Sequence, residues 1–264
     1  MKIIPYKDVY DPTLLQPVPR APHRRELGIE GDLPFTGADI WTAYELSWLD
    51  RSGKPRVAMA TFVVDAGSPN LIESKSFKLY LNSFNQTALD TPEALRKRLL
   101  EDIGSACGAP VGVEIRLPGD FDDERVEEMD GEIIDEIDVE VRDYRPNPAL
   151  LRTGRSAVDE TLVSNLLKTN CPLTGQPDWA SIQIRYRGPR IDRAGLLRYL
   201  VSFRQHGGFH EHCVENIFTD IAARCRPEGL TVFARYMRRG GLDINPFRTN
   251  CGDKVPRNVR TARQ

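Results

Sequence analysis

The sequence lacks any long run of apolar residues, and none approaches the roughly 18 that a membrane-spanning helix needs. Residues 1–5 also lack the apolar core of a signal peptide. We therefore expect a cytoplasmic protein without membrane contact. Cysteine is scarce: the five cysteines are odd in number and none forms a Cys-x-x-Cys pair, which argues against a disulfide framework and a zinc ribbon. One of them is a candidate working thiol.

The chain also has little net charge, with a formal value of −2. It therefore has no bulk attraction to nucleic acid, and such a contact would need a local patch. No Gly-x-Gly-x-x-Gly follows a predicted strand, so any nucleotide is expected to be bound by side chains and not by a Rossmann turn. What is present, 264 residues with 40% hydrophobic and 28% charged content, predicts a soluble folded chain of one large domain or two small ones.

Hydrophobic periodicity predicts an α+β fold built from a duplicated unit. Residues 1–38 hold six prolines without an apolar period and are expected to form an extended arm. The elements predicted for the first half are, in order, strands over 39–49 and 57–64, helices from Ser74 and from Thr91, a strand over 111–117, a solvated acidic loop over 119–132 and an edge strand over 133–141.

The second half repeats this ββααββ order. Its predicted elements are strands over 162–168 and 182–186, helices over 192–203 and 210–223, a strand over 230–236, and the segment 238–246 that follows it. The sequences also match, because residues 79–86 (Leu-Tyr-Leu-Asn-Ser-Phe-Asn-Gln) resemble residues 198–205 (Arg-Tyr-Leu-Val-Ser-Phe-Arg-Gln). We predict two modules, 39–150 and 151–264. Each copy holds motifs that the other lacks, so one site assembled from both halves is expected.

The first such motif opens the helix that starts near Ser74. Ser74 is the expected N-cap, and residues 70–73 are expected to form a loop aimed at the helix start. A carboxylate at Glu73, beside unpaired backbone N–H groups and Lys75, suits a ligand with a donor-rich edge and a phosphate. The alternative is a capped, solvated helix entry with no ligand.

Three further motifs belong to the second half. Cys171 lies in a Pro/Gly-rich loop with Asp178 a short way along the chain, although a cysteine is often only a small buried hydrophobe. His210 opens a helix in Phe-His-Glu-His-Cys; it is either structural or functional, and the His/Cys cluster does not match zinc-ligand spacing. A cluster of arginines beside two glycines is either a phosphate clamp or a charged strand end. This cluster comprises Arg235, Arg238 and Arg239.

Together, Glu-Ser-Lys-Ser-Phe-Lys-Leu-Tyr, Cys-Pro-Leu-Thr-Gly-Gln-Pro-Asp, Phe-His-Glu and Arg-Gly-Gly-Leu-Asp-Ile-Asn-Pro resemble one family. The chain is similar to the NADPH-dependent 7-cyano-7-deazaguanine reductases, the nitrile reductases of queuosine biosynthesis, in their two-module form. The resemblance runs from about residue 39 to residue 250. It implies tandem tunnelling-fold modules, each with four antiparallel strands and two helices, which agrees with the predicted repeat.

The resemblance also implies the chemistry. Cys171 is expected to add to the nitrile as a thiolate and form a thioimide, with Asp178 as the proton carrier. Two NADPH molecules per turnover then reduce the thioimide through an imine to the aminomethyl product, and no metal is required. His210 is expected to close over the substrate. The implied substrate-binding residues are Ile72, Glu73, Ser74, His210 and Glu211, and the implied NADPH-binding residues are Ser74, Lys75, Arg239 and Gly240.

Two other classes compete with this interpretation. A zinc-dependent, pterin-forming cyclohydrolase or synthase shares the tunnelling fold and a purine-binding glutamate, but His210, His212 and Cys213 are too crowded in the sequence to supply its metal ligands. A non-catalytic tRNA- or nucleotide-binding module would use the arginines near 235–239 and 257–263, against which the acid-rich loops count. We expect no direct nucleic-acid partner. Unpaired sheet edges predict a homodimer or a larger ring.

Overall fold

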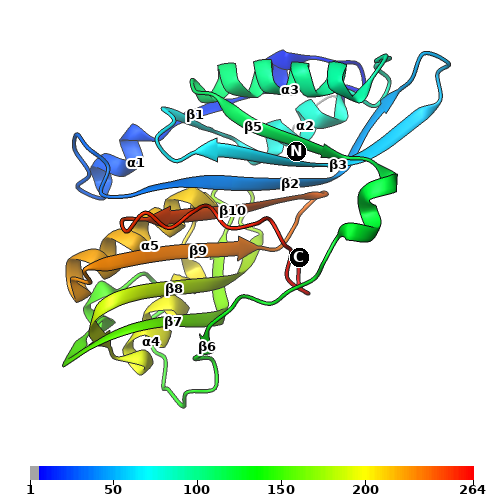
Figure 1. Ribbon diagram of the computed structural model, residues 1–264. Helices are drawn as coiled ribbons and strands as arrows, with labels where there is room; N and C mark the ends of the chain where they lie inside the picture. The colour runs from blue at the N-terminus through cyan, green and yellow to red at the C-terminus, as the bar shows by residue number, and fades with distance from the viewer. Residues whose placement is uncertain (1–5) are drawn as a thin grey trace. The chain divides into compact units, whose positions relative to one another are not determined.

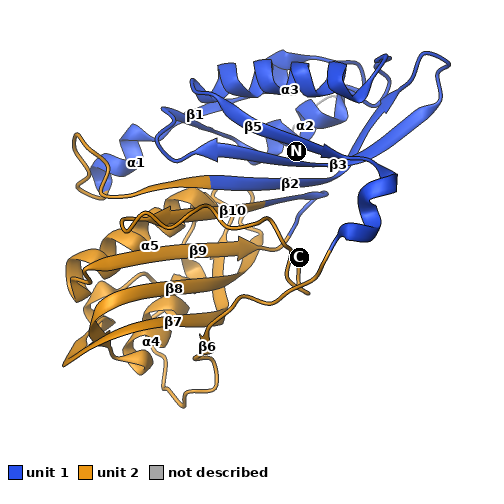
Figure 2. Cartoon of the chain, in the orientation of Figure 1, with its two compact units in different colours: residues 1–26, 39–124, 238–243 blue, residues 27–38, 125–237, 244–264 orange. Residues whose placement is uncertain are grey.

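The computed structural model describes residues 6–264 (Figure 1). The prediction about a signal peptide in residues 1–5 lies outside the described residues. The chain forms two compact units, shown in Figure 2. Unit 1 comprises residues 1–26, 39–124 and 238–243, and unit 2 comprises residues 27–38, 125–237 and 244–264. The predicted module boundary at residue 150 stays a prediction, because each unit is made of three separate segments of the chain and no single boundary divides them.

Unit 1 packs two helices on one face of a sheet with the strand order β5-β3-β2 (Figure 1). Aromatic side chains join the layers. The Phe77 ring of the first helix lies 5.2 Å from the Trp41 ring and 5.0 Å from the Phe62 ring, both on the sheet. The elements are β2 (Thr36–Leu49), β3 (Pro55–Asp65), α2 (Ser74–Asn82), α3 (Pro92–Cys107) and β5 (Val111–Arg116).

Helices α2 and α3 form where the sequence predicts them. In α3 the Thr91 hydroxyl accepts a hydrogen bond from the Ala94 N–H, and Pro92 fills the first turn. The apolar residues that recur at helical spacing are buried in both helices, except Leu100 of α3, which is only partly buried. The buried ones are Phe77, Tyr80 and Leu81 in α2, and Leu95, Leu99 and Ile103 in α3.

Residues 6–38 contain more regular structure than the predicted extended arm. They contain η1 (Pro12–Leu14), β1 (Pro17–Pro19) and α1 (Ala21–Glu26). Strand β1 pairs antiparallel with β4 (Asn70–Ile72), so the predicted loop over 70–73 is wrong for its first three residues. A buried ion pair fixes this segment, because the Arg20 guanidinium lies 2.5 Å from the Asp39 carboxylate and each side chain is 1% exposed.

Unit 2 confirms the predicted ββααββ order. Its strand order is β10-β9-β8-β7-β6, with longer hairpin strands than predicted. The elements are β6 (Glu132–Ile133), η3 (Pro148–Leu150), β7 (Thr153–Asn170), β8 (Pro177–Ile191), α4 (Arg193–Ser202), η4 (Phe203–Gln205), α5 (His210–Cys225), β9 (Gly229–Tyr236) and β10 (Leu242–Thr249). The α+β class therefore holds, with antiparallel strand pairs and helices in both units.

Two predictions for the region between the repeats are wrong. The acidic segment is not all loop, because η2 (Pro118–Asp123) is a 3-10 helix. The predicted edge strand over 133–141 shrinks to β6, which pairs in parallel with β7. Its extension ends at Asp135, whose carboxylate accepts from the Ser164 hydroxyl at 2.6 Å and the Asn165 N–H at 2.9 Å. A side chain thus takes the place of the backbone acceptor that a longer strand would provide.

The repeat is visible in side-chain bonds. The Tyr80 hydroxyl donates to Asp102 in unit 1, and the Tyr199 hydroxyl donates to Asp220 in unit 2, each at 2.6 Å. Serines at the C-terminal ends of α2 and α4 also correspond. The Ser83 hydroxyl accepts from the Asp11 N–H and the Ser202 hydroxyl from the Asn147 N–H, each at 3.2 Å.

This equivalence extends the repeat into the first 38 residues. Asp11 caps η1 as Asn147 caps η3. The matching sequences are Asp11-Pro12-Thr13-Leu14-Leu15 and Asn147-Pro148-Ala149-Leu150-Leu151. The arm is therefore the start of the first repeat. Within residues 6–264, no helix has the length and apolar character to cross a membrane.

Candidate active site

Cys171 begins the tight loop between β7 and β8. The last residue of β7, Asn170, pairs with the first residue of β8, Pro177. The Cys171 N–H donates to the Gln176 carbonyl at 2.8 Å, and the Gly175 N–H donates to the Cys171 carbonyl at 2.9 Å. Gly175 has a φ of 70°, which favours glycine. The loop therefore holds the backbone of Cys171 in place while its side chain stays partly exposed.

Asp178 and His210 meet near this loop. Asp178 is 4% exposed and lies opposite Thr169 on the hairpin, and its carboxylate is 3.3 Å from Nε2 of His210. The chain before His210 is tied to the hairpin end, because the Asn170 N–H donates to the His206 carbonyl at 2.8 Å. Unit 2 thus brings the Asp178 carboxylate and the His210 imidazole together at the end of the hairpin whose loop begins with Cys171.

His210 is also fixed by an aromatic neighbour. Its ring stacks on Tyr236 with 3.7 Å between the ring centroids and 4° between the planes. The adjacent Glu211 is 1% exposed in the first turn of α5, where the helix dipole favours an anion. Sequence reasoning missed Tyr236, whose position on a wholly buried strand resembles that of a core residue.

The other cysteines of unit 2 differ from Cys171. Burial raises the pKa of the Cys213 thiol to about 12 and that of the Cys225 thiol to about 11. Both thiols are therefore neutral at pH 7 and poor nucleophiles. Cys251 is exposed, but it lies in the segment after β10 and not in the hairpin loop. Among the cysteines of unit 2, Cys171 alone is partly exposed and lies in the hairpin loop that leads to Asp178.

Glu73 is the N-cap of α2, so the prediction that Ser74 caps the helix is wrong. The Glu73 carboxylate accepts from the Lys75 N–H at 2.8 Å and from the Ser76 N–H at 2.7 Å. The backbone of Glu73 is held by the residue that precedes β1, because the Glu73 N–H donates to the Gln16 carbonyl at 2.9 Å. A carboxylate offers about four lone pairs, and two remain for a ligand. Ile72 is buried on β4 beside it.

The predicted NADPH-binding residues gather at the same helix. Residues 239–242 form a tight turn, in which the Arg239 N–H donates to the Leu242 carbonyl at 3.0 Å. Gly240 and Gly241 have φ values of 61° and 75°, so both central positions require glycine. The turn lies over α2, since a Cβ added to Gly240 would be 3.4 Å from Cδ of Lys78. Lys75 is exposed one turn earlier.

Of the three arginines proposed as a phosphate clamp, Arg235 is excluded. It is 3% exposed, and its guanidinium donates to Gln264 and Asn258 within unit 2. Arg238 is exposed and lies 4.4 Å from the centre of the Tyr44 ring. Positive charge at the turn therefore comes from Arg238 and Arg239.

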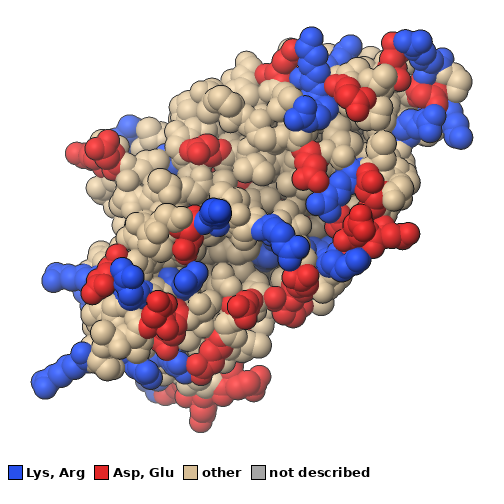
Figure 3. Space-filling view, viewed as in Figure 1, with Lys and Arg blue, Asp and Glu red and all other residues tan. Residues whose placement is uncertain are grey.

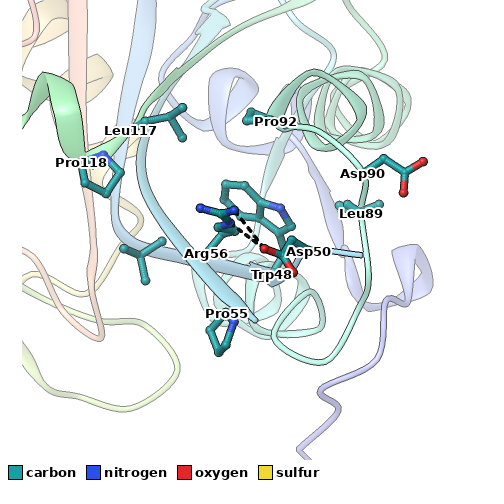
Figure 4. Close-up of a pocket in the computed structure, with 10 residues that line it drawn as sticks. Trp48, Asp50, Pro55, Arg56, Leu89, Asp90, Pro92, Leu117 and Pro118 are labelled. Atoms are coloured by element: carbon teal, nitrogen blue, oxygen red, sulfur yellow. Dashed lines mark hydrogen bonds and ion pairs between the residues drawn. The ribbon is translucent and has the colours of Figure 1, made fainter. Parts of the chain in front are cut away.

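Unit 1 has a different arrangement at the positions that correspond to Cys171, Asp178 and His210 of unit 2. Asp50 begins the β2–β3 loop as Cys171 begins the β7–β8 loop, and Pro92 begins α3 as His210 begins α5. Arg56 is second in β3 as Asp178 is in β8, and it lies 3.0 Å from Asp50. These residues line a pocket of about 380 Å³ with Trp48, shown in Figure 4. An ion pair and a proline replace the thiol, acid and imidazole.

The two competing interpretations require a cluster of metal ligands and a basic surface patch, respectively. Among residues 6–264 no group of three or more His, Cys, Asp or Glu side chains is arranged to hold a metal ion. Figure 3 shows Lys and Arg side chains interspersed with Asp and Glu on the visible face. Two tail arginines are bonded within the protein: Arg260 donates to the Gln264 carbonyl and Arg263 to the Asn165 carbonyl.

Comparisons with known proteins show the family of the chain. Residues 6–115 match the family model described as nitrile reductase, 7-cyano-7-deazaguanine-reductase N-term, and residues 177–254 match the model described as QueF-like protein. The chain is 59% identical to the NADPH-dependent 7-cyano-7-deazaguanine reductase of Bordetella avium over 99% of this chain and 96% of that protein. It is 58% identical to the protein of the same name from Burkholderia multivorans, over 98% and 95% of the two chains. The chain therefore belongs to the family of NADPH-dependent 7-cyano-7-deazaguanine reductases.

Proposed function

We propose that this protein reduces the nitrile of 7-cyano-7-deazaguanine to the aminomethyl group of 7-aminomethyl-7-deazaguanine, with two molecules of NADPH, in the biosynthesis of queuosine in tRNA. The observation that carries the proposal is the joint presence of a loop-held, accessible Cys171 and the Asp178–His210 pair in a chain of this family. The two repeats are proposed to be tandem tunnelling-fold modules. The repeated Tyr–Asp and serine bonds support a duplication.

The thiol is proposed to activate the nitrile. A nitrile carbon is a poor hydride acceptor, and addition of the Cys171 S–H across the C≡N bond gives a thioimide with a more electrophilic C=N carbon. A free thiol with a pKa near 8.5 is mostly protonated at pH 7. Asp178 is proposed to accept the thiol proton, and the same proton is then transferred to the nitrile nitrogen.

His210 is proposed to hold Asp178 and to cover the substrate. Its Nε2 lies 3.3 Å from the Asp178 carboxylate, and its ring is supported from behind by Tyr236. Nδ1 of His210 is buried and has no hydrogen-bond partner among residues 6–264, so it is suited to a polar group of a ligand. These contacts support a positioned base, whose geometry matters as much as its pKa.

Substrate recognition is proposed to use carboxylates. The amide and amino edge of a deazaguanine presents N–H donors, and Glu73 and Glu211 supply acceptors. Buried or helix-held carboxylates make stronger bonds than neutral acceptors. Ile72 contributes an apolar contact and Ser74 a hydroxyl at the start of α2. The retained lone pairs of Glu73 support this role.

NADPH, when bound, supplies the hydride. Ser74, Lys75, Arg239 and Gly240 are proposed to bind it, and the close approach of the glycine turn to α2 fits such a ligand. The positive side chains of this region suit the 2′-phosphate that distinguishes NADPH from NADH. Addition of the first hydride to the thioimide, with loss of the Cys171 thiolate, gives an imine. A second hydride and one proton give the amine, and a second proton restores the Cys171 thiol. Two hydrides and two protons thus balance the four-electron reduction.

The proposal is tested by following NADPH oxidation at its absorbance band with 7-cyano-7-deazaguanine as substrate. We expect two NADPH consumed for each nitrile reduced, and no consumption by Cys171→Ala of unchanged fold. Wild-type protein that binds the nitrile but leaves NADPH unoxidised would contradict the proposed reaction. The homodimer and the cytoplasmic location stay predictions, as do a metal-free mechanism and the absence of nucleic-acid partners.

A further inference from the structure

The segment after β10 ends in a buried carboxamide. Gln264 is 4% exposed, and its side chain makes four hydrogen bonds within unit 2. Oε1 accepts from Nε of Arg235 at 2.5 Å and from the Thr261 N–H at 3.0 Å. Nε2 donates to the Tyr236 carbonyl at 2.8 Å and to Oδ1 of Asn245 at 2.8 Å. These bonds use both donors and both acceptor lone pairs of the amide.

Gln264 and Asn245 together hold the backbone of Tyr236. The Tyr236 carbonyl accepts from Gln264, and the Tyr236 N–H donates to Oδ1 of Asn245 at 3.2 Å. Tyr236 is the last residue of β9. Toward β10 the backbone pairing of β9 ends at Phe233, so the bonds to Gln264 and Asn245 hold Tyr236 where that pairing is lost. Toward β8 the pairing continues to Met237, whose N–H donates to the Trp179 carbonyl at 2.9 Å. Its ring stacks on His210, whose Nε2 faces Asp178. One chain of contacts therefore runs from Gln264 through Tyr236 to the Asp178–His210 pair.

We propose that Gln264 is a positioning residue for the active site: by fixing the end of β9 it sets the Tyr236 ring, and through it the orientation of His210 toward Asp178. The part concerning turnover rests on the proposed nitrile reduction. A small displacement of a catalytic group has a large effect on rate, because reacting groups must meet at close distance and correct angle. The four side-chain bonds of Gln264 described above go to residues other than His210 and Cys171.

The chemistry of the position favours an amide. A glutamate has the same shape and can still accept from Arg235, but it has no N–H to donate to the Tyr236 carbonyl or to Asn245. It would also place a carboxylate against the Tyr236 carbonyl, where two acceptors repel. Gln264→Glu should therefore fold with its Arg235 bond intact and yet release the end of β9. Gln264→Ala removes all four bonds.

Arg263→Ala is the matched control. The Arg263 guanidinium binds the same tail to the Asn165 carbonyl at 2.9 Å and to the Ser181 hydroxyl at 3.1 Å, and neither of these bonds involves Tyr236. This variant loosens the tail without removing the bonds to β9. A purely structural role of the tail would give all three variants similar losses.

The first measurement does not depend on the reaction. Ring protons of His210 lie over the face of Tyr236, so their NMR signals should be shifted upfield in the wild-type protein. Gln264→Glu and Gln264→Ala should reduce that shift, whereas Arg263→Ala should leave it as in wild type. Unchanged His210 signals in both Gln264 variants would overturn the proposal, whatever reaction the enzyme catalyses.

The second measurement is turnover. We expect the Gln264 variants to lower kcat about 10- to 100-fold through misplacement of His210, with the NADPH KM within about twofold of wild type. Thermal unfolding measured in parallel identifies a variant that has lost its fold, and Gln264→Glu is the variant expected to keep it. A kcat for folded Gln264→Glu equal to that of Arg263→Ala would overturn the positioning role. A wild-type enzyme without nitrile reduction, but with the expected NMR changes, would contradict only the proposed function.

Discussion

Glu73 is expected to have two separable roles, and Glu73→Ala should reveal both. Its carboxylate caps α2 by accepting the Lys75 N–H at 2.8 Å and the Ser76 N–H at 2.7 Å. Loss of an N-cap costs about 0.5–2 kcal/mol of stability. For a chain of this size we expect the midpoint of thermal unfolding to fall by about 2–4 °C for each kcal/mol lost.

The second effect of Glu73→Ala is on ligand affinity. The proposed bonds from the deazaguanine to Glu73 would leave buried donors unpaired when the carboxylate is removed, at a cost of about 1–3 kcal/mol. This raises the dissociation constant about 5- to 150-fold. Titration calorimetry with 7-cyano-7-deazaguanine should be done in a Cys171→Ala background, where no covalent adduct can form.

The repeat supplies the control for this experiment. Asp192 caps α4 as Glu73 caps α2, with its carboxylate accepting the Gly195 N–H at 3.2 Å. Asp192→Ala should cost similar unfolding free energy and leave the affinity unchanged. Equal loss of affinity in the two variants would show that Glu73 acts only through helix stability, and the recognition role would be refuted.

Two further predictions concern cofactor choice and thiol reactivity. Arg239→Ala should raise the KM for NADPH about 10-fold or more, because a charge-assisted bond contributes about 1.5–3 kcal/mol. The same substitution should change the KM for NADH much less. Equal changes in the two KM values would mean that Arg239 binds a group common to both cofactors. In the folded protein at pH 8, iodoacetamide should modify Cys171 and Cys251 before Cys213 and Cys225, whose pKa values are raised to about 12 and about 11 from 9.0. The unfolded chain releases the Cys213 and Cys225 thiol protons at lower pH than the folded chain does, so the free energy of unfolding should fall as pH rises from about 9 to about 12. Urea unfolding measured across this pH range would give a constant free energy of unfolding if the burial argument were wrong.

The buried faces of the helices could be predicted because they depend on local periodicity. In α2, apolar spacing identified Phe77, Tyr80 and Leu81 as core residues, and all three are buried. The cap was harder to predict, since Glu73 and Ser74 are both polar residues at the helix start. The choice depends on the extended backbone of Glu73, with φ −63° and ψ 125°, which the sequence does not display.

Long-range contacts explain the other positions at which the structure differs from the predictions made from the sequence. Arg235 lies beside surface arginines in the sequence, yet the tail returns to bury it against Gln264. The segment 133–141 alternates like a strand, but Asp135 ends its pairing by bonding to β7. The extension of the repeat toward the N-terminus is visible in the sequence as Asp-Pro-x-Leu-Leu at residues 11–15 and Asn-Pro-x-Leu-Leu at residues 147–151, so a five-residue match is enough to detect it.

The site residues from the two repeats could be proposed from motifs because each motif is short and local. Cys171 and Asp178 belong to one hairpin, and Glu73, Ser74 and Lys75 belong to one helix start. Residues that support them belong to distant segments. Gln16 and Tyr236 bear no motif, and their relation to the site follows only from the folded chain.

The central claim is that Cys171 adds covalently to the nitrile, and intact-mass spectrometry tests it most directly. The wild-type protein should be incubated with 7-cyano-7-deazaguanine in the absence of NADPH, and Cys171→Ala should be treated in the same way. Since the thiol adds across the nitrile without a leaving group, the account predicts a wild-type mass increased by the full mass of the substrate, located at Cys171, and an unchanged mass for the variant. An unmodified wild-type mass under conditions in which the same preparation oxidises NADPH would contradict the account.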